Sequence, residues 1–383
     1  MKQATEECVV KKERLLDALE MLDQIPVRTS LPTSVYVKAT PVGGSKLRFV
    51  RLYLSAEVAG YVDIAPYAGL WPFDHTVYLD RRLLFSFCLA ARTIKSKSDF
   101  KFKVQNGELL VTSGTRKLKL ACAVETAGYA QAPVGGSRVE VEPELVAMLQ
   151  RAKQCTQGEW AKAELETVML NPEDGGIALY ATTGMLHFRA QVPSELKLKR
   201  PTPFPLMLID MLKAKVLAGL EVTDKEVVLV YRHGKLWQSM NAVARKEFPL
   251  VNFSKMVAKL RQSSKPSFTL YSTALSASVQ RLVSYLASVR KLDWIVTLSG
   301  KKEDSSRLGM VVKISGALFR EQVKLKSSLT NDVDVDWPLD KVAGLLVDVA
   351  EKGRVMAVSL DQQGRAYVKV GSDIELVVPR RLR

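Results

Sequence analysis

The feature that most constrains this chain is a pattern that occurs three times, at intervals of about 130 residues. Each copy begins with an amphipathic helix, in which apolar residues recur every three or four positions. These first helices are expected at 11–22, 142–155 and 275–290. The interval is too long for a solenoid, whose repeats span roughly 20–50 residues, and it indicates a series of similar domains.

A second helix and a β-hairpin complete each copy. The second helices are expected at 80–94, 205–217 and 338–350. Each is followed by two β-forming runs that are joined by a short turn. The turn glycines, which are expected to supply the positive φ angle that such hairpins need, are Gly107, Gly234 and Gly364.

This repeated order of helices and antiparallel strands predicts an α+β fold of three similar domains. The chain has 383 residues, which is too long for one hydrophobic core. Stretches with the composition of linkers lie at 132–137 and 262–266. We therefore expect domains at 1–133, 138–262 and 266–383, each with two helices and antiparallel sheet.

The chain is strongly basic, with 56 Lys and Arg residues against 40 Asp and Glu residues and a net charge of +16. Basic residues exceed acidic residues in each of the three copies, so the charge does not come from one tail. Such a balance favours a polyanionic partner, with nucleic acid ahead of an anionic membrane surface. A generally basic protein without such a partner is the alternative.

No pattern in the sequence indicates a catalytic or metal site. The three histidines do not pair with each other or with cysteines at ligand spacing, and no glycine motif has the form of a phosphate-binding loop. Asp332, Asp334 and Asp336 alternate and could present carboxylates to a metal, but a solvated strand face is the preferred interpretation. We expect no catalytic residues, no metal and no cofactor.

The cysteines and the N-terminus indicate the compartment. The cysteines do not form a Cys-x-x-Cys pair and are expected to be free thiols in a reducing environment. The first residues lack the apolar core of a signal peptide, and no apolar run approaches the roughly 18 residues that span a bilayer. We expect a cytoplasmic, nucleoid-associated protein without a membrane partner.

Four short motifs, in order along nearly the whole chain, resemble those of the bacterial sliding clamp, the β subunit of DNA polymerase III. They are LLVTSGTR at 109–116, ATTGM at 181–185, Phe248-Pro249 and LVVPRRL at 376–382. Several positions depart from the family pattern, including Thr183, Leu250 and Arg380, and the family is usually acidic overall. A divergent clamp is therefore indicated, and a phage or plasmid source would fit.

The resemblance implies a ring of two subunits joined head to tail, with helices lining a central hole around duplex DNA and sheets outside. In that family the ring tethers DNA polymerase, makes no bond itself, and is opened and closed by an ATP-driven clamp loader. The alternative is a clamp-like module that binds DNA as an open form. An enzyme with an unrecognised site is a third hypothesis.

The resemblance also implies two sets of site residues. Helix cations would contact DNA phosphates without sequence specificity; these are Lys11, Lys12, Arg14, Arg81, Arg82, Arg92, Arg151, Lys153, Lys213, Lys215, Arg281, Arg290 and Lys341. A pocket between the second and third domains would bind the short peptide motifs of polymerase, loader and other partners; its residues are Leu165, Thr182, Gly184, Pro249, Leu376, Val378 and Pro379.

Overall fold

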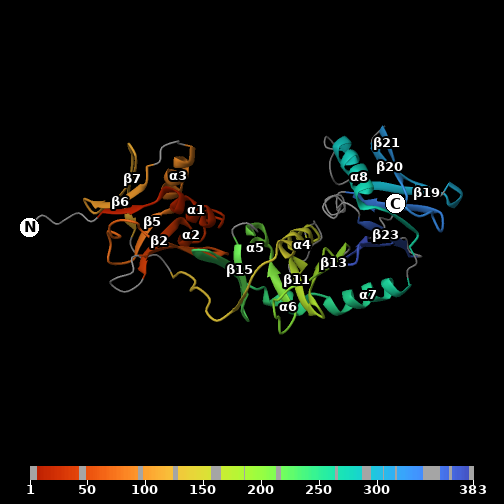
Figure 1. The fold of residues 1–383 in the computed structure, drawn as a ribbon, viewed down its shortest axis with the longest axis horizontal. Coiled ribbons are helices and arrows are strands. Elements are labelled where there is room, and N and C mark those ends of the chain that lie inside the picture. The colour runs from red at the N-terminus through yellow and green to blue at the C-terminus, as the bar shows by residue number, and fades with distance from the viewer. Residues whose placement is uncertain are drawn as a thin grey trace, which may run out of the picture. The chain divides into compact units, whose positions relative to one another are not determined.

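The computed structural model describes residues 7–42, 49–93, 98–123, 128–156, 165–184, 186–212, 217–263, 266–286, 295–304, 306–314, 317–339, 354–361 and 365–378. The chain forms two compact units (Figure 1). Unit 1 comprises Met1–Val141 and Met211–Ser239, and unit 2 comprises Glu142–Asp210 and Met240–Arg383. The expected boundaries of three domains stay a prediction.

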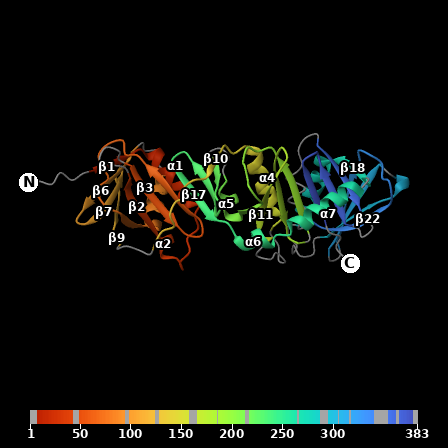
Figure 2. The same ribbon diagram turned by 90° about the horizontal axis from the view of Figure 1, so that it is seen from below.

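Unit 1 contains two antiparallel sheets (Figures 1 and 2). One has the strand order β1-β6-β7-β8, and the other has the order β10-β15-β16-β17-β4-β3-β2-β5-β9. The strands are β1 (Glu7–Val10), β2 (Tyr36–Val42), β3 (Phe49–Ser55), β4 (Ala59–Ile64), β5 (Val77–Asp80), β6 (Phe100–Gln105), β7 (Glu108–Ser113), β8 (Arg116–Leu120), β9 (Cys122–Ala123), β10 (Ser137–Val139), β15 (Leu217–Val222), β16 (Glu226–Tyr231) and β17 (Gly234–Ser239).

Unit 2 also contains two antiparallel sheets. Their strand orders are β14-β11-β12-β13-β25-β24-β23-β18 and β21-β20-β19-β22. The strands are β11 (Thr167–Glu173), β12 (Gly176–Thr182), β13 (His187–Val192), β14 (Thr202–Pro205), β18 (Phe268–Tyr271), β19 (Ile295–Gly300), β20 (Arg307–Ile314), β21 (Ala317–Lys324), β22 (Val333–Pro338), β23 (Val355–Leu360), β24 (Ala366–Val370) and β25 (Ile374–Val378).

The expected first helices are confirmed, because each has an apolar face that is buried against the sheets. The second helices at 80–94 and 205–217 are shorter than expected, and 340–350 lies outside the described residues. The helices are α1 (Lys12–Asp23), α2 (Pro32–Val35), α3 (Arg81–Ala90), η1 (Ala91–Thr93), α4 (Pro143–Gln154), α5 (Leu206–Met211), α6 (Ala242–Glu247), α7 (Leu250–Ser263), α8 (Ser272–Leu286) and η4 (Lys302–Asp304).

Strand pairing repeats three times in the same order, as the α+β prediction requires. The three sets are β2–β5, β11–β14 and β19–β22. In each set the strands lie side by side in the order fourth, first, second, third, counted along the chain. The first strand of each copy, β1, β10 or β18, pairs with a following three-stranded meander. Each copy therefore has two four-stranded sheets with the same connections.

Two joints link these copies into continuous sheets. Joint 1 is the antiparallel pairing of β17 with β4 in unit 1, and joint 2 is the pairing of β25 with β13 in unit 2. In both joints, the last strand of one copy's meander pairs with the third strand of the preceding copy's other sheet. The last strand of the first copy's meander, β8, lies at a sheet edge instead of in such a joint. The same is true of β21, the third strand of the last copy's other sheet.

The turn glycines behave differently from one another. The turn at Asn106 and Gly107 is confirmed, with φ angles of 53° and 80°. The prediction for Gly234 is wrong, because this residue is the first of β17 and does not have a positive φ angle. A Cβ atom there would lie 2.2 Å from the Tyr61 carbonyl oxygen, so glycine is required by the close approach of β4. Gly364 lies outside the described residues.

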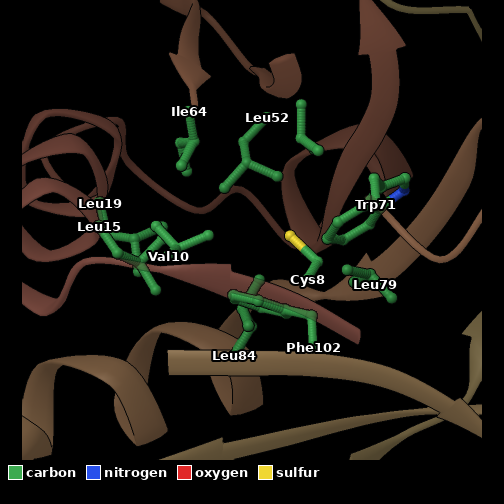
Figure 3. A pocket seen from close by; sticks show the side chains of 11 residues that line it. Cys8, Val10, Leu15, Leu19, Leu52, Ile64, Trp71, Leu79, Leu84 and Phe102 are labelled. Carbon is green, nitrogen blue, oxygen red and sulfur yellow. The ribbon is translucent and has the colours of Figure 1, made fainter. Parts of the chain in front are cut away.

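A small void lies in the core of unit 1, between the helices and both sheets (Figure 3). Its volume is about 20 Å³, and apolar side chains line it, including Leu15, Leu84 and Phe102. Burial raises the pKa of the Cys8 thiol at its wall to about 12. A thiol that stays protonated at neutral pH is a packing group, as expected of a structural cysteine.

Candidate nucleic-acid and partner sites

Exposed cations gather on the two packed helices of unit 1. Arg14 on α1 and Arg82 on α3 are exposed, and Lys11 at the start of α1 lies over the Tyr67 ring, 5.8 Å from its centroid. Lys12 is half-buried, and its backbone N–H donates to Asp99. Exposed guanidinium and ammonium groups on a helix surface are suited to phosphate contacts.

Arg14 also lies on the wall of a large groove in unit 1. The groove has a volume of about 1040 Å³ and is lined by α1, the end of β4 and the strands β15 and β17. Met21, Val62 and Leu217 contribute apolar surface, whereas Arg14 and Arg232 contribute cations. A large ligand can therefore reach the Arg14 side chain from solvent.

Arg81 requires a correction, because its side chain is buried and cannot meet DNA as an exposed cation would. Its Nη2 atom donates to the carbonyl oxygens of Leu22, Asp23 and Ile25, at 2.5 to 3.2 Å. These are the last carbonyl groups of α1 and the residues after it, and α1 has no basic residue in its own last turn. Arg81 therefore caps α1 from the neighbouring helix.

Three further helix cations are held by carboxylates. Arg92 pairs with Glu20 at 2.7 Å and Arg281 pairs with Glu321 at 2.9 Å, and Lys153 is paired with Asp210. Arg151 is half-buried, and its Nη1 atom contacts the Met148 sulfur. Each pair reduces the charge that a phosphate would meet. Lys213, Lys215, Arg290 and Lys341 lie outside the described residues.

Some of the expected peptide-pocket residues come together beside α7. The Thr182 hydroxyl accepts the Gly184 N–H at 2.8 Å and lies 2.8 Å from His187 Nδ1. Gly184 has a φ angle of 91° and faces Leu165, which belongs to the apolar cluster under α7. Thr182 and Gly184 lie where the chain turns from β12 into its antiparallel partner β13.

The structure places Leu376 and Val378, two other expected pocket residues, on the opposite face of the sheet. Val377 packs in the cluster under α7, so its neighbours Leu376 and Val378 point to the opposite face of β25, where they are fully buried. Pro249 is exposed directly before α7, and Pro379 lies outside the described residues. The period of two in a strand, which the sequence already showed, separates these side chains.

Helix α7 was not expected from the sequence, and it covers this face of the sheet. The Phe253 ring lies 5.1 Å from the Tyr180 ring and 4.9 Å from the His187 ring, between centroids. Val257 is also buried against the sheet. The apolar positions of α7 recur at helical spacing in the sequence, so this signal could have identified the helix.

A buried ion network fixes the end of α7. Arg261 donates twice to the Glu375 carboxylate, at 2.9 and 2.7 Å, and Arg189 donates to it at 2.9 Å. Burial would raise the pKa of Glu375, but hydrogen bonds from Arg261 and Tyr367 outweigh this effect and hold it below the usual range. The carboxylate is therefore charged at neutral pH and links α7 to joint 2.

Other kinds of site were also considered within the described residues. In this part of the chain no group of three metal-binding side chains occurs, and no helix is long and apolar enough to cross a membrane. Asp336 is buried and accepts a hydrogen bond from Thr297 at 2.6 Å, while Asp332 is exposed and pairs with Lys301. Asp332 and Asp336 therefore each bind a neighbouring side chain.

The chain has the fold of bacterial sliding clamps over nearly its full length. It is similar to a DNA polymerase sliding clamp from Pseudomonas aeruginosa, with 14% identity, a TM-score of 0.79 and coverage of 99% of this chain and 100% of that one. A Bartonella birtlesii clamp bound to griselimycin gives 12% identity, a TM-score of 0.80 and the same coverage. A Caulobacter crescentus clamp has 13% identity and a TM-score of 0.79, and the match again covers 99% of this chain and 100% of that one.

In sequence, the chain stands apart from these proteins. No family model matches it, and no curated protein matches it. The property that the chain shares with these proteins is therefore the architecture.

Proposed function

We propose that this chain is a DNA sliding clamp, a non-catalytic processivity factor that encircles duplex DNA and tethers a DNA polymerase. The observation that carries the proposal is the threefold repeat of strand pairing, together with a fold similarity to sliding clamps that covers 99% of the chain. Non-specific contacts from helix cations to phosphates would hold DNA, and no bond would be made or broken.

The ring would form as a head-to-tail homodimer through β8 and β21, the two strands that take no part in the in-chain joints. In joints 1 and 2, a meander's last strand pairs with a third strand of the other sheet type. Strand β8 is the last strand of the first meander, and β21 is the third strand of the last copy. Pairing β8 of one subunit with β21 of the next repeats the same joint, and two such joints close a ring.

Exposed apolar side chains at both edges support this joint. Leu83 on α3, beside β8, is 51% exposed, and Leu318 and Tyr285 on β21 and α8 are 47% and 48% exposed. Phe319 stacks on Tyr285 with 5.0 Å between ring centroids. Unpaired strand edges flanked by apolar groups are suited to association with another chain.

Within the ring, Arg14, Arg82 and Lys11 would be the principal phosphate contacts of unit 1. Partners such as DNA polymerase and an ATP-driven clamp loader would bind the surface around Leu165, Thr182 and Gly184, where α7 forms one wall. The protein would act in the cytoplasm at the nucleoid. A phage or plasmid source would fit its divergence.

Retention on DNA of different topology tests the proposal. The protein is loaded on nicked circular DNA, washed with high salt, and measured again after the DNA is linearised. A closed clamp is retained on the circle and lost from linear ends. The control is the same protein mixed with DNA that was linear from the start.

An open DNA-binding module is the second candidate, and the basic character of the whole chain favours it. Open binding would be lost with added salt, with a slope of about −0.9 per phosphate contact, on circular and linear DNA alike. In either form, replacing Arg14 and Arg82 by alanine should lower this slope by about 0.9 per lost contact, whereas the exposed Lys197 and Lys225 serve as control positions.

A further inference from the structure

Both in-chain joints contain a cation that a carboxylate neutralises. In joint 1, Lys235 of β17 pairs with Glu221 of β15 at 2.7 Å. In joint 2, Arg189 of β13 pairs with Glu375 of β25 at 2.9 Å. These side chains lie on the same sheet face as Trp237 in joint 1 and as Val377 in joint 2, which is the face away from α1 and α4.

The same outer face can be identified on the two free edges. On β8, Leu120 is buried in the core, so Lys117 and Lys119 point to the other face. On β21, Phe319 and Glu321 contact Tyr285 and Arg281 of helix α8. The remaining positions of β21, which include Leu318 and Arg320, therefore point away from the helix.

In a joint between β8 and β21, the charged side chains that the two strands present on the outer face would all be cations. Lys117 and Lys119 of β8 lie on this face together with Arg320 of β21, while the single carboxylate of the two strands, Glu321, lies on the helix side with Arg281. Any register that keeps Leu120 and Phe319 on the helix side preserves this division of charges between the two faces, because faces change only with a one-residue shift. Like charges on facing strands destabilise pairing, so this joint differs from joints 1 and 2.

We propose that the outer face of the β8–β21 joint is a binding site for an acidic peptide segment of another protein. This segment supplies the carboxylates that Glu221 and Glu375 supply in the in-chain joints. The inference rests on the proposed ring, in which DNA contacts the helix side of the sheets, so nucleic acid is not the anion at this face. Closure of the ring is thereby coupled to an acidic partner.

Sedimentation velocity of the full chain, over a range of concentrations at low salt (about 50 mM NaCl), tests the site. The probe is a hexaglutamate peptide, and hexaglutamine is its neutral control. We expect hexaglutamate to raise the dimer fraction of the wild-type protein and hexaglutamine to leave it unchanged. The double variant K117E/K119E supplies the carboxylates itself, so it should dimerise without peptide and on the order of tenfold more tightly.

The variant K197E/K225E makes the same change of charge at exposed positions away from β8 and β21, and should behave as the wild-type protein does. A wild-type dimer that is tight at low salt, loosens in about 500 mM NaCl and ignores hexaglutamate would overturn the inference and leave the ring intact. A wild-type protein and a K117E/K119E variant that are both monomeric in every condition would overturn the ring proposal and the inference together.

Discussion

Joints 1 and 2 occupy the same place in the repeated topology, yet different interactions stabilise them. In joint 1, Gly60 and Gly234 allow close backbone approach, and the outer face is aromatic, with Tyr53, Tyr61 and Trp237 in contact. In joint 2, the outer face holds a buried ion network under α7. One pairing geometry therefore tolerates both solutions, provided that each buried charge has a partner.

The largest expected effect comes from removing the central carboxylate of joint 2. Glu375→Gln takes a charged partner from Arg189, whose side chain is only 9% exposed, and from Arg261. Arg189 keeps its second carboxylate partner, Glu173, at 2.5 Å, so we expect a loss of about 3 kcal/mol, the lower end of the cost of breaking a buried ion pair. Urea denaturation followed by circular dichroism measures the loss of stability.

The corresponding change in joint 1 is the control for that variant. Glu221→Gln removes the partner of Lys235, whose side chain is 24% exposed and can turn to water. We expect a loss of about 1 kcal/mol. Equal losses for the two variants would contradict the contrast between an ionic joint and an aromatic one.

Joint 2 should also be the acid-sensitive one. Burial, followed by the nearby Arg365 charge, lowers the pKa of His187 to about 4. The unfolded chain, with an imidazole pKa of about 6.5, then binds the proton first, so stability is complete above pH 6.5 and falls as the pH decreases towards 4. The expected loss is on the order of 3 kcal/mol across that range.

Urea midpoints at several pH values measure this dependence. His187→Asn should flatten the profile between pH 6.5 and 4, and His75→Asn, at an exposed position in unit 1, should leave it unchanged. A profile that keeps its full slope in His187→Asn would assign the acid sensitivity to other groups.

Joint 1 should instead be sensitive to added volume. In Gly234→Ala, the new methyl group would lie 2.2 Å from the Tyr61 carbonyl oxygen and 3.0 Å from the Val62 Cα atom, so the strands must separate. Overpacking of this kind costs about 1–3 kcal/mol. Gly128→Ala, where a Cβ atom meets no heavy atom within 4 Å, is the matched control and should be nearly neutral in the same urea experiment.

Local patterns in the sequence predicted much of the fold. The apolar spacing of Leu15, Leu19 and Leu22 predicted α1, and Asn106-Gly107 predicted the hairpin of β6 and β7. Both features depend on residues that are neighbours in the chain. The α+β class and the threefold order followed from these elements. The joints could not be predicted in this way, because they depend on strands that are about 170 to 190 residues apart.

The candidate sites were predicted less completely, for the same physical reason. Arg81 and Arg82 are adjacent cations on one helix, but only the packing of α3 against α1 shows that the first is buried and the second exposed. Leu376 and Val378 were grouped with Thr182 by resemblance, whereas the alternation of β25 separates them. Resemblance locates a site along the chain, and the packing decides which atoms are accessible.

The contact of Arg81 with the end of α1 has a mechanical consequence. One guanidinium binds three carbonyl groups of the neighbouring helix segment, so α1 and α3 are fastened at a point where helices usually fray. Arg14 and Arg82 therefore start from two helices that are fastened together, so the distance between their backbone positions is set before any ligand binds. In the proposed clamp, DNA that slides along α1 and α3 would meet cations on helices that keep their relative position. Sliding would then need no rearrangement of the protein.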